Sequence, residues 1–206
     1  MMKLYIDGIE ATAGPGETLL RLIRSVNLDS CSLSDRPLAA KIAGEVFNLN
    51  YIPVRMKDAK PDRLSIRRAM AASNGTVQLV RYSDPVGRDV YTRTVQFVLF
   101  MALRKLWPEA HVRMDFAVGK ALYIEVRDAV SFSVERLKEE IADLIAKDIP
   151  LIRQRLCTDA AIKHFNEEGQ HDKAKLLSWR ERDYFDVYAY EDFKDYYYGE
   201  LAPSTG

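Results

Sequence analysis

Side chains that could perform catalytic chemistry are few in this chain and lie far apart. The three histidines, His111, His164 and His171, suit neither a zinc tetrad nor a catalytic triad by their spacing, and no Gly-x-Ser-x-Gly or paired-acid signature accompanies them. The two cysteines, Cys31 and Cys157, are too few for a disulfide framework or a structural zinc site. The spacing of these residues therefore predicts no metal site and no nucleophile paired with a base.

A run of basic residues lies between Arg55 and Arg68. It holds six basic and two acidic residues, a local charge of +4. Arg63 and Arg67 are four residues apart and share a face if the segment is helical. Two interpretations remain open. Arg63, Arg67 and Arg68 contact RNA phosphates, or the run is a solvated connector, which is the commoner role of a charged segment.

One apolar stretch must position whatever site the chain has. Residues 95–103 are apolar except for Gln96, which indicates a helix buried on several sides. Residues 112–118 and 122–126 then alternate apolar and polar side chains around a glycine turn, which indicates a half-buried hairpin. The polar residues 91–94 enter the helix where we expect a cleft to open.

The N-terminal part indicates a β-grasp unit. Residues 3–13 alternate as two strands around Asp7-Gly8, a sequence typical of a type I′ turn. Thr18 can cap a short helix, and residues 38–42 and 46–49 indicate two further strands.

The remaining elements follow from the same periodicities. Residues 133–147, with Ser133 as the cap, and then 158–168 and 172–180 have helical spacing. Residues 76–82 and 184–190 indicate strands.

Composition and charge exclude little. The 206 residues include 30 basic and 30 acidic side chains, so net charge gives no argument for nucleic acid or a membrane as partner. The N-terminus lacks the apolar run of a signal peptide, and no stretch approaches the ~20 apolar residues of a membrane span. We expect a cytoplasmic protein without a membrane partner.

The first strands and helix resemble a known module. The sequence YIDGIEATAGPGETLLRLI, followed by PLAAKIAGEVFNL, is similar to the TGS domain, a small β-grasp module at the N-terminus of threonyl-tRNA synthetases and in several GTPases and nucleotide-metabolising enzymes. The resemblance covers residue 2 to about residue 54.

The later elements resemble the second additional domain of threonyl- and alanyl-tRNA synthetases, which removes a wrongly attached amino acid. YTRTVQFVLFMALRKLWP matches the buried helix of that family, MDFAVGKALYIEV its hairpin, HFNEEGQHDKAKLL its helix pair and FKDYYYGELAPSTG its closing strand. The resemblance implies an α+β fold in which a larger α+β domain, an antiparallel sheet packed on a long buried helix, follows the β-grasp unit. We expect a TGS-like domain at 1–56, a connector helix at 57–75 and the editing-like region at 76–206.

The editing site of that family rests on a His-x-x-x-His pair in the helix and a Cys-x-x-x-His pair in the closing strand. The matching positions of this chain hold Arg93 and Phe97, and Tyr197 and Leu201. Arginine stays charged, phenylalanine and leucine offer no lone pair, and a tyrosine with an ordinary pKa near 10 is a poor base. We therefore expect no catalytic residue, no metal and no cofactor in this segment.

The same cleft could still hold a ligand. Lys173 and Asp195 match polar pocket positions of the family. We predict that Arg93 holds an anion or a carboxylate, with Phe97, Lys173, Asp195 and Tyr197 as further candidate lining residues. The simpler interpretation is that Lys173 is a surface lysine and Asp195 a strand-end acid.

The combined order resembles the N-terminal half of a bacterial fusion family of nucleoside or uridine kinases. In that family the helix motif reads Tyr-x-Arg-x-x-x-Phe, as Tyr91, Arg93 and Phe97 do here. The resemblance implies a kinase domain in cis beyond Gly206, where the related folds run on, and ATP and Mg²⁺ would belong to that domain only.

Three functions follow as hypotheses. The first is a non-catalytic region of a nucleoside kinase that binds RNA or a nucleotide. The second is an aminoacyl-tRNA deacylase that uses Lys173, Asp195 and water. The third is a structural region for dimerisation or docking, in which Phe97 and Tyr197 fill the cleft.

Overall fold

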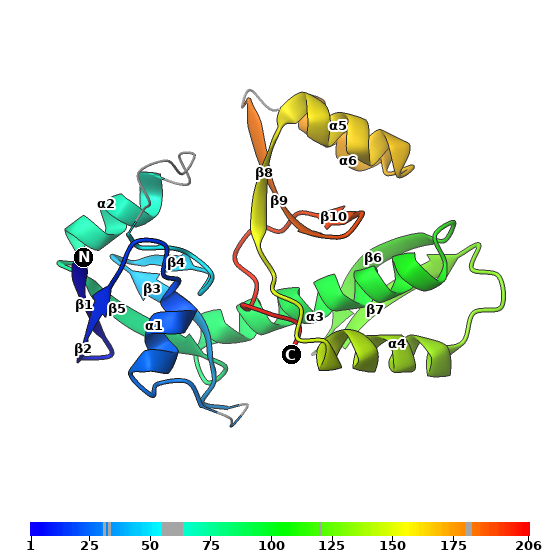
Figure 1. Ribbon diagram of the computed structural model, residues 1–206. Helices are drawn as coiled ribbons and strands as arrows, with labels where there is room; N and C mark the ends of the chain where they lie inside the picture. Colours follow the sequence, from blue (N-terminus) through cyan, green and yellow to red (C-terminus); the bar gives the residue numbers. More distant parts are fainter. Residues whose placement is uncertain (31, 33, 55–63, 120, 180–182) are drawn as a thin grey trace. The chain divides into compact units, whose positions relative to one another are not determined.

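Figure 1 shows a computed structural model of the chain, which describes residues 1–30, 32, 34–54, 64–119, 121–179 and 183–206. The elements in chain order are β1 (Met2–Ile6), β2 (Ile9–Ala13), α1 (Leu19–Ser25), β3 (Pro37–Ile42), β4 (Glu45–Phe47), α2 (Leu64–Ala72), β5 (Thr76–Arg81), α3 (Pro85–Leu106), β6 (His111–Val118), β7 (Ala121–Arg127), α4 (Val134–Ala146), β8 (Arg153–Cys157), α5 (Thr158–Glu167), α6 (His171–Ser178), β9 (Tyr184–Tyr190) and β10 (Phe193–Asp195). They form two units: unit 1 comprises Met1–Pro150 and Gly199–Gly206, and unit 2 comprises Leu151–Tyr198.

A five-stranded sheet with the order β2-β1-β5-β3-β4 forms the N-terminal part of unit 1. β1 and β2 pair antiparallel around Asp7 and Gly8, whose φ angles of 45° and 85° are those of a type I′ turn. The hairpin expected at residues 3–13 is confirmed. Thr18 caps α1, since its hydroxyl accepts a hydrogen bond from the amide of Arg21.

The central strand of this sheet is β5, which the sequence placed in the second domain. It pairs parallel with β1 and antiparallel with β3. The expected boundaries at 56 and 76 therefore divide one sheet. The physical reason is that β1 and β3 both need a partner for their inner edge, and β5 supplies it.

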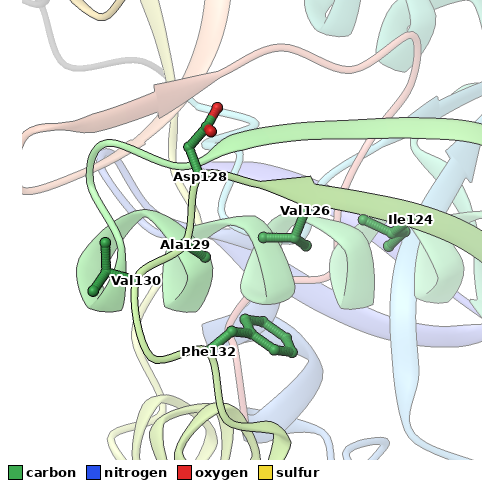
Figure 2. Close-up of a pocket in the computed structure, with 6 residues that line it drawn as sticks. All are labelled: Ile124, Val126, Asp128, Ala129, Val130 and Phe132. Atoms are coloured by element: carbon green, nitrogen blue, oxygen red, sulfur yellow. The ribbon is translucent and has the colours of Figure 1, made fainter.

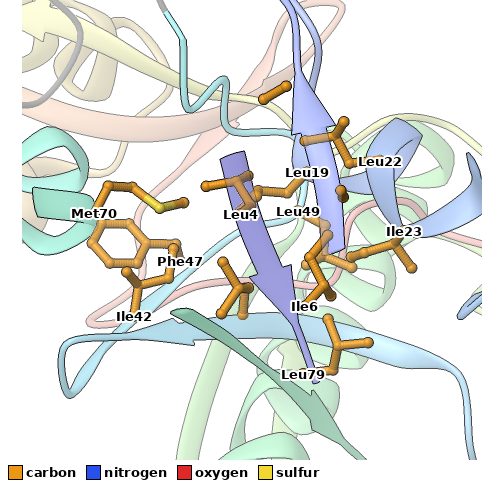
Figure 3. Close-up of a cluster of buried hydrophobic side chains, with 14 of the residues drawn as sticks. Leu4, Ile6, Leu19, Leu22, Ile23, Ile42, Phe47, Leu49, Met70 and Leu79 are labelled. Carbon is orange, nitrogen blue, oxygen red and sulfur yellow. The ribbon is translucent and has the colours of Figure 1, made fainter. Parts of the chain in front are cut away.

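The core under this sheet also includes the helix expected as a connector. Leu4, Ile6 and Ile23 are fully buried there, and Met70 of α2 packs with them (Figure 3). The helix α2 is thus part of the β-grasp core. Residues 55–63, the first part of the expected connector, lie outside the described residues.

The long helix α3 follows β5 after a tight turn. Pro85 stands in its first turn, where its fixed φ suits a helix start. Gly87 is required there, because a Cβ at this position would collide with the carbonyl oxygen of Arg81. The buried helix expected at 95–103 is present, although Val95 is 46% exposed. Within the described residues, no helix is long and apolar enough to cross a membrane.

The hairpin β6–β7 and the helix α4 pack on the second half of α3. Leu103 and Trp107 are buried at the end of α3, and Val112, Val126 and Leu137 pack against this cluster. The hairpin turn has Gly119 at φ 61°, as the sequence predicts, and Ser133 caps α4 by accepting from the amide of Arg136.

Unit 2 is a three-stranded antiparallel sheet, β10-β9-β8, covered by α5 and α6. Phe165 and Ala174 of the helices pack on Phe185 and Val187 of β9. The helices α5 and α6 and the strand β9 agree with the sequence prediction, whereas β8 was not predicted. The pattern of β8 is Arg153-Gln-Arg-Leu-Cys157, whose arginines conceal the alternation of a strand.

The segment 199–206 lies in the interior of unit 1, although most of it has no strand partner. Leu201 is fully buried, and Asn48 donates from Nδ2 to the carbonyls of Leu201 (2.8 Å) and Ala202 (3.2 Å). Thr205 accepts from the amide of Ile149 at 2.9 Å and donates to the carbonyl of Leu144. Side chains thus satisfy backbone groups that a sheet ladder would otherwise pair.

Replacement of Asn48 by alanine should destabilise the chain. The side chain is 2% exposed and also accepts from the amide of Asn50, so the substitution leaves buried backbone groups unsatisfied. We expect the free energy of unfolding to fall by about 1–3 kcal/mol in urea titrations. Glu139→Ala, at an exposed position of α4, serves as the control and should change the value by less than about 0.5 kcal/mol. Equal effects of the two substitutions would contradict the role of Asn48.

Candidate functional site

Arg93 is half-buried on α3, and its side chain holds the 199–206 segment. Its Nε donates to the carbonyl oxygen of Glu200 at 3.1 Å. Its guanidinium lies directly against Gly199, where an added Cβ would come within 2.8 Å of Cζ. The residue therefore has a structural task. A carbonyl oxygen accepts a hydrogen bond without cancelling a positive charge, so the charge of Arg93 stays available to attract an anion.

Thr94 is one of the polar residues 91–94 that the sequence places at the expected cleft, but it was not predicted as a lining residue. Its hydroxyl donates to the carbonyl of Val90 at 2.8 Å and accepts from the amide of Ala202 at 2.8 Å. Together Arg93 and Thr94 fix two consecutive stretches of the 199–206 segment. The signal that could have found Thr94 is its polar side chain at the edge of an apolar helix face.

Phe97 and Leu201 are both fully buried. These are two of the three positions to which the family resemblance assigns histidines. Their side chains fill the interior and expose no surface. The hypothesis that Phe97 and Tyr197 fill a cleft stays a prediction. The role of Phe97 as a ligand contact stays a prediction.

Lys173 and Asp195 form an ion pair within unit 2. Lys173 Nζ lies 2.6 Å from Asp195 Oδ1, and the same oxygen accepts from the amide of Tyr196 at 2.8 Å. The ammonium also lies 5.7 Å from the ring centroid of Phe165 and 5.8 Å from that of Tyr196, which are cation–π distances. The acid side chain is only 10% exposed. Each charge is therefore met by an opposite charge or an aromatic face.

Tyr197 follows this pair in the chain. Burial raises the pKa of its phenol well above the ordinary value, and the negative charge of Asp195 raises it further. The phenol stays protonated at neutral pH. It can take part in hydrogen bonds there, but it cannot act as a base.

The predicted lining residues are divided between the two units. Arg93 and Phe97 belong to unit 1, whereas Lys173, Asp195 and Tyr197 belong to unit 2. The structure brings Lys173 and Asp195 together. A single cleft lined by all five residues stays a prediction.

The basic run of the sequence is described only in part. Arg63 lies outside the described residues, Arg67 is placed by its backbone in α2, and Arg68 is exposed on the same helix. An RNA contact by these three residues also stays a prediction.

An open pocket of about 620 Å³ lies beside β7 and the loop that follows it. Figure 2 shows its lining residues, which are Ile124, Val126, Asp128, Ala129, Val130 and Phe132. The lining is apolar apart from Asp128, whose carboxylate lies 3.2 Å from Nδ1 of His111. Within the described part of the chain, no three His, Cys, Asp or Glu side chains gather in a way that could hold a metal ion.

Comparison with known proteins adds a relationship that covers the whole chain. No family model matches it. Alignments over 211 positions cover all of the chain. In them the chain is 26% identical to the threonine–tRNA ligase of Desulforamulus reducens and 28% identical to that of Acetivibrio thermocellus. Over 97% of its length it is 24% identical to the threonine–tRNA ligase of Syntrophomonas wolfei. The chain resembles part of these ligases.

The chain spans about 30% of the length of each of these relatives. The similarity supports a threonyl-tRNA synthetase-like N-terminal region with an editing-domain-like fold, and the α+β fold class is confirmed. None of the three relatives is a kinase, so the kinase-linked parent protein expected from the sequence has no support from them.

The raised pKa of Tyr197 predicts that the stability of the folded chain falls as the pH rises above 10. Below the ordinary tyrosine pKa of 10.0, the folded and the unfolded chain both keep this phenol protonated, so it adds no pH dependence. Above pH 10 the unfolded chain releases the proton while the folded chain retains it, so stability falls as pH rises. We expect Tyr197→Phe to lose less stability than wild type between pH 9 and pH 11.5 in urea titrations. The same slope for Tyr198→Phe and Tyr197→Phe would contradict this assignment, since Tyr198 is 75% exposed.

Proposed function

We propose that this chain is a threonyl-tRNA synthetase-like editing region that binds the aminoacylated end of tRNA without hydrolysing it. The likeness to threonine–tRNA ligases over the full length of the chain supports the tRNA part of the proposal. The absence of hydrolysis follows from the residues at the positions of the family's imidazoles and thiol. Arginine, phenylalanine, tyrosine and leucine stand there, and none of them can deliver a general base at neutral pH.

One observation carries this proposal. Arg93, at the first of those positions, donates to the backbone of Glu200, and Leu201, at the last, is fully buried. Positions that serve catalysis in the family thus hold the interior together in this chain. These positions then offer one positive charge and no general base, which suits binding of an anionic nucleotide better than catalysis.

Lys173 and Arg93 are the candidate phosphate contacts, and they differ in whether an acidic side chain already neutralises their charge. Asp195 already pairs with Lys173 at 2.6 Å, so the Lys173 ammonium would have to give up that partner to bind a phosphate. Arg93 donates to an uncharged carbonyl and need not give up an ion pair. In this proposal Arg93 attracts the nucleotide, and Lys173, Asp195 and Tyr197 are further candidate contacts on unit 2.

Two substitutions at Arg93 separate its charge from its hydrogen bond. Arg93→Lys and Arg93→Met both lose the Nε bond to Glu200, but only the methionine loses the charge. We expect tRNA to bind the lysine variant about five- to tenfold more tightly than the methionine variant at low salt. The plot of log affinity against log salt should also be less steep for the methionine variant by about 0.7–0.9.

Fluorescence anisotropy with labelled tRNA measures both quantities, and deacylation of correctly charged and mischarged tRNA is followed in parallel. Wild type should bind tRNA, and the aminoacyl ester should be hydrolysed at the same rate with and without the protein. Equal affinities and salt slopes for the two variants would limit Arg93 to a structural role. Failure of wild type to bind any tRNA would refute the proposal as a whole.

A second candidate function is an aminoacyl-tRNA deacylase that uses Lys173, Asp195 and water. The close, partly buried pair of a lysine and an acid favours it, because lysine and carboxylate side chains can both serve as general acids or bases. The pair is also explained by stability alone, since Asp195 compensates a partly buried ammonium.

Asp195→Asn separates the two roles of this pair. We expect the free energy of unfolding to fall by about 1–3 kcal/mol, because a charge-assisted bond is lost, and the deacylation rate to stay at the rate without protein. Wild-type turnover above that rate, abolished in both Asp195→Asn and Lys173→Met, would instead establish the deacylase. Lys175→Met, on the same helix, is the matched control.

A further inference from the structure

The dipeptide Asn74-Gly75 lies just after α2, where the chain turns into β5. Both residues have a left-handed backbone, with φ angles of 49° and 76°. The amide of Gly75 donates to the carbonyl of Met70 at 3.0 Å. This is the long-range bond of a Schellman motif, with which many helices end on a glycine.

Position 75 accepts only glycine. An added Cβ would lie 2.7 Å from the backbone carbonyl oxygen of Lys3, and a positive φ strains any residue that has a Cβ. Asparagine is one of the few other residues that adopt a left-handed backbone readily, which suits position 74. The shape of the turn therefore favours the sequence Asn-Gly.

Asn-Gly is also a chemically labile sequence, because asparagine is lost on ageing and glycine has no side chain to shield its nitrogen. The backbone nitrogen of the glycine attacks Cγ of the asparagine, and the new N–C bond closes a five-membered succinimide. The amide proton passes through water to Nδ2, which leaves as ammonia. A water molecule then opens the ring and gives either aspartate or isoaspartate, in which the main chain runs through the side-chain carbon.

The folded turn opposes this attack in two ways. The ring closes only when the Gly75 nitrogen and the Cβ of Asn74 lie on the same side of the Cα–C bond, and a left-handed backbone places them on opposite sides. The amide proton that must leave Gly75 is held by the carbonyl of Met70. Asn74 is exposed, whereas Gly75 is buried. The reaction therefore requires that the end of α2 opens first.

We propose that Asn74-Gly75 is a site of spontaneous deamidation that the folded chain holds closed, and that isoaspartate formed there locks the β1–β5 pairing open. The carbonyl of Gly75 accepts from the amide of Tyr5 at 2.9 Å, and Tyr5 is opposite Thr76 in the parallel pairing of β1 and β5. Isoaspartate inserts one more backbone carbon directly before this contact. Because β5 is the central strand of its sheet, the insertion weakens the β-grasp part. This site is independent of the proposed function.

The end of α1 supplies an internal control. Asn27 also has a left-handed backbone, at φ 57°, and the amide of Leu28 donates to the carbonyl of Ile23 at 3.0 Å. The two turns share the same hydrogen bond, but leucine follows this asparagine. We expect the unfolded chain to deamidate at least about tenfold faster at Asn74 than at Asn27, because only glycine leaves its nitrogen unshielded.

Peptide mapping by mass spectrometry measures the deamidated fraction of Asn74 in the full chain, folded and in urea, at the same mildly alkaline pH. We expect the folded chain to react at least about tenfold more slowly, since only the locally opened population reacts. Met70→Ala removes a buried side chain but keeps the carbonyl, so it should bring the folded rate closer to the unfolded one. Glu139→Ala, exposed on α4, should not change the rate.

Urea concentrations below the unfolding transition open the turn without any substitution, so they replace Met70→Ala if that variant does not fold. The folded rate should rise with urea in this range, because local opening becomes more frequent. A folded rate that equals the unfolded rate, or that responds neither to Met70→Ala nor to urea, would mean that the turn does not hold the site closed. Absence of reaction at Asn74 in the unfolded chain would exclude the site.

Asn74→Asp separates the new charge from the longer backbone. This variant has the side chain of aspartate on an ordinary main chain and should unfold at the same urea concentration as wild type. The purified isoaspartate chain should unfold at a lower urea concentration, and its Tyr5 amide should exchange hydrogen at least about tenfold faster. An isoaspartate chain as stable as Asn74→Asp, with equal protection of Tyr5, would overturn the locking of β1 and β5. None of these outcomes depends on whether the chain binds tRNA.

Discussion

The pairing of buried backbone groups in the 199–206 segment is the constraint on which the rest of unit 1 depends. This segment passes through the interior without a continuous strand partner, so its amides and carbonyls must be satisfied by side chains. Asn48, Arg93 and Thr94 provide those bonds from distant parts of the sequence. Thr205, within the segment, bonds in turn to the amide of Ile149 and the carbonyl of Leu144. Because an unsatisfied buried group costs about 1–3 kcal/mol, these four residues fix the path of the segment and connect the β-grasp sheet, α3 and the end of α4.

This constraint also explains how a fold can be kept when the side chains at catalytic positions are replaced. Residues four apart on α3 share a face, so positions 93 and 97 adjoin the same interior in any protein with this helix. Histidines at such positions serve a reaction, whereas Arg93 and Phe97 here serve hydrogen bonding and packing. A fold stabilised at these points can keep a binding surface after its proton-transfer groups are gone, since fold and function are separable.

Arg93 and the ion pair of unit 2 differ in physical character. Arg93 acts through charge, is half-buried and is coupled to the interior through Glu200. The electrostatic attraction proposed for it supplies affinity that weakens with salt. In unit 2, the ammonium of Lys173 is already paired with the carboxylate of Asp195. This ion pair therefore contributes to stability whether or not it binds a ligand.

Patterns between neighbouring residues were enough to predict the local elements. The Asp7-Gly8 turn, the helix that contains residues 95–103 and the cap of α4 at Ser133 all depend on residues within one or two turns of each other, so short-range periodicity was enough to predict them. The absence of an imidazole at position 93 was also visible at once. These features need no knowledge of what packs against them.

Which elements pack against one another could be seen only in the folded chain. β5 lies between β1 and β3, although about seventy residues separate it from β1, and β8 became recognisable only through its pairing with β9. The pairing of Phe116 with Tyr123 needed a bulge that no sequence pattern announced. A sequence pattern shows which face of an element is buried, but the partner that buries it is chosen by contacts between residues far apart in the chain.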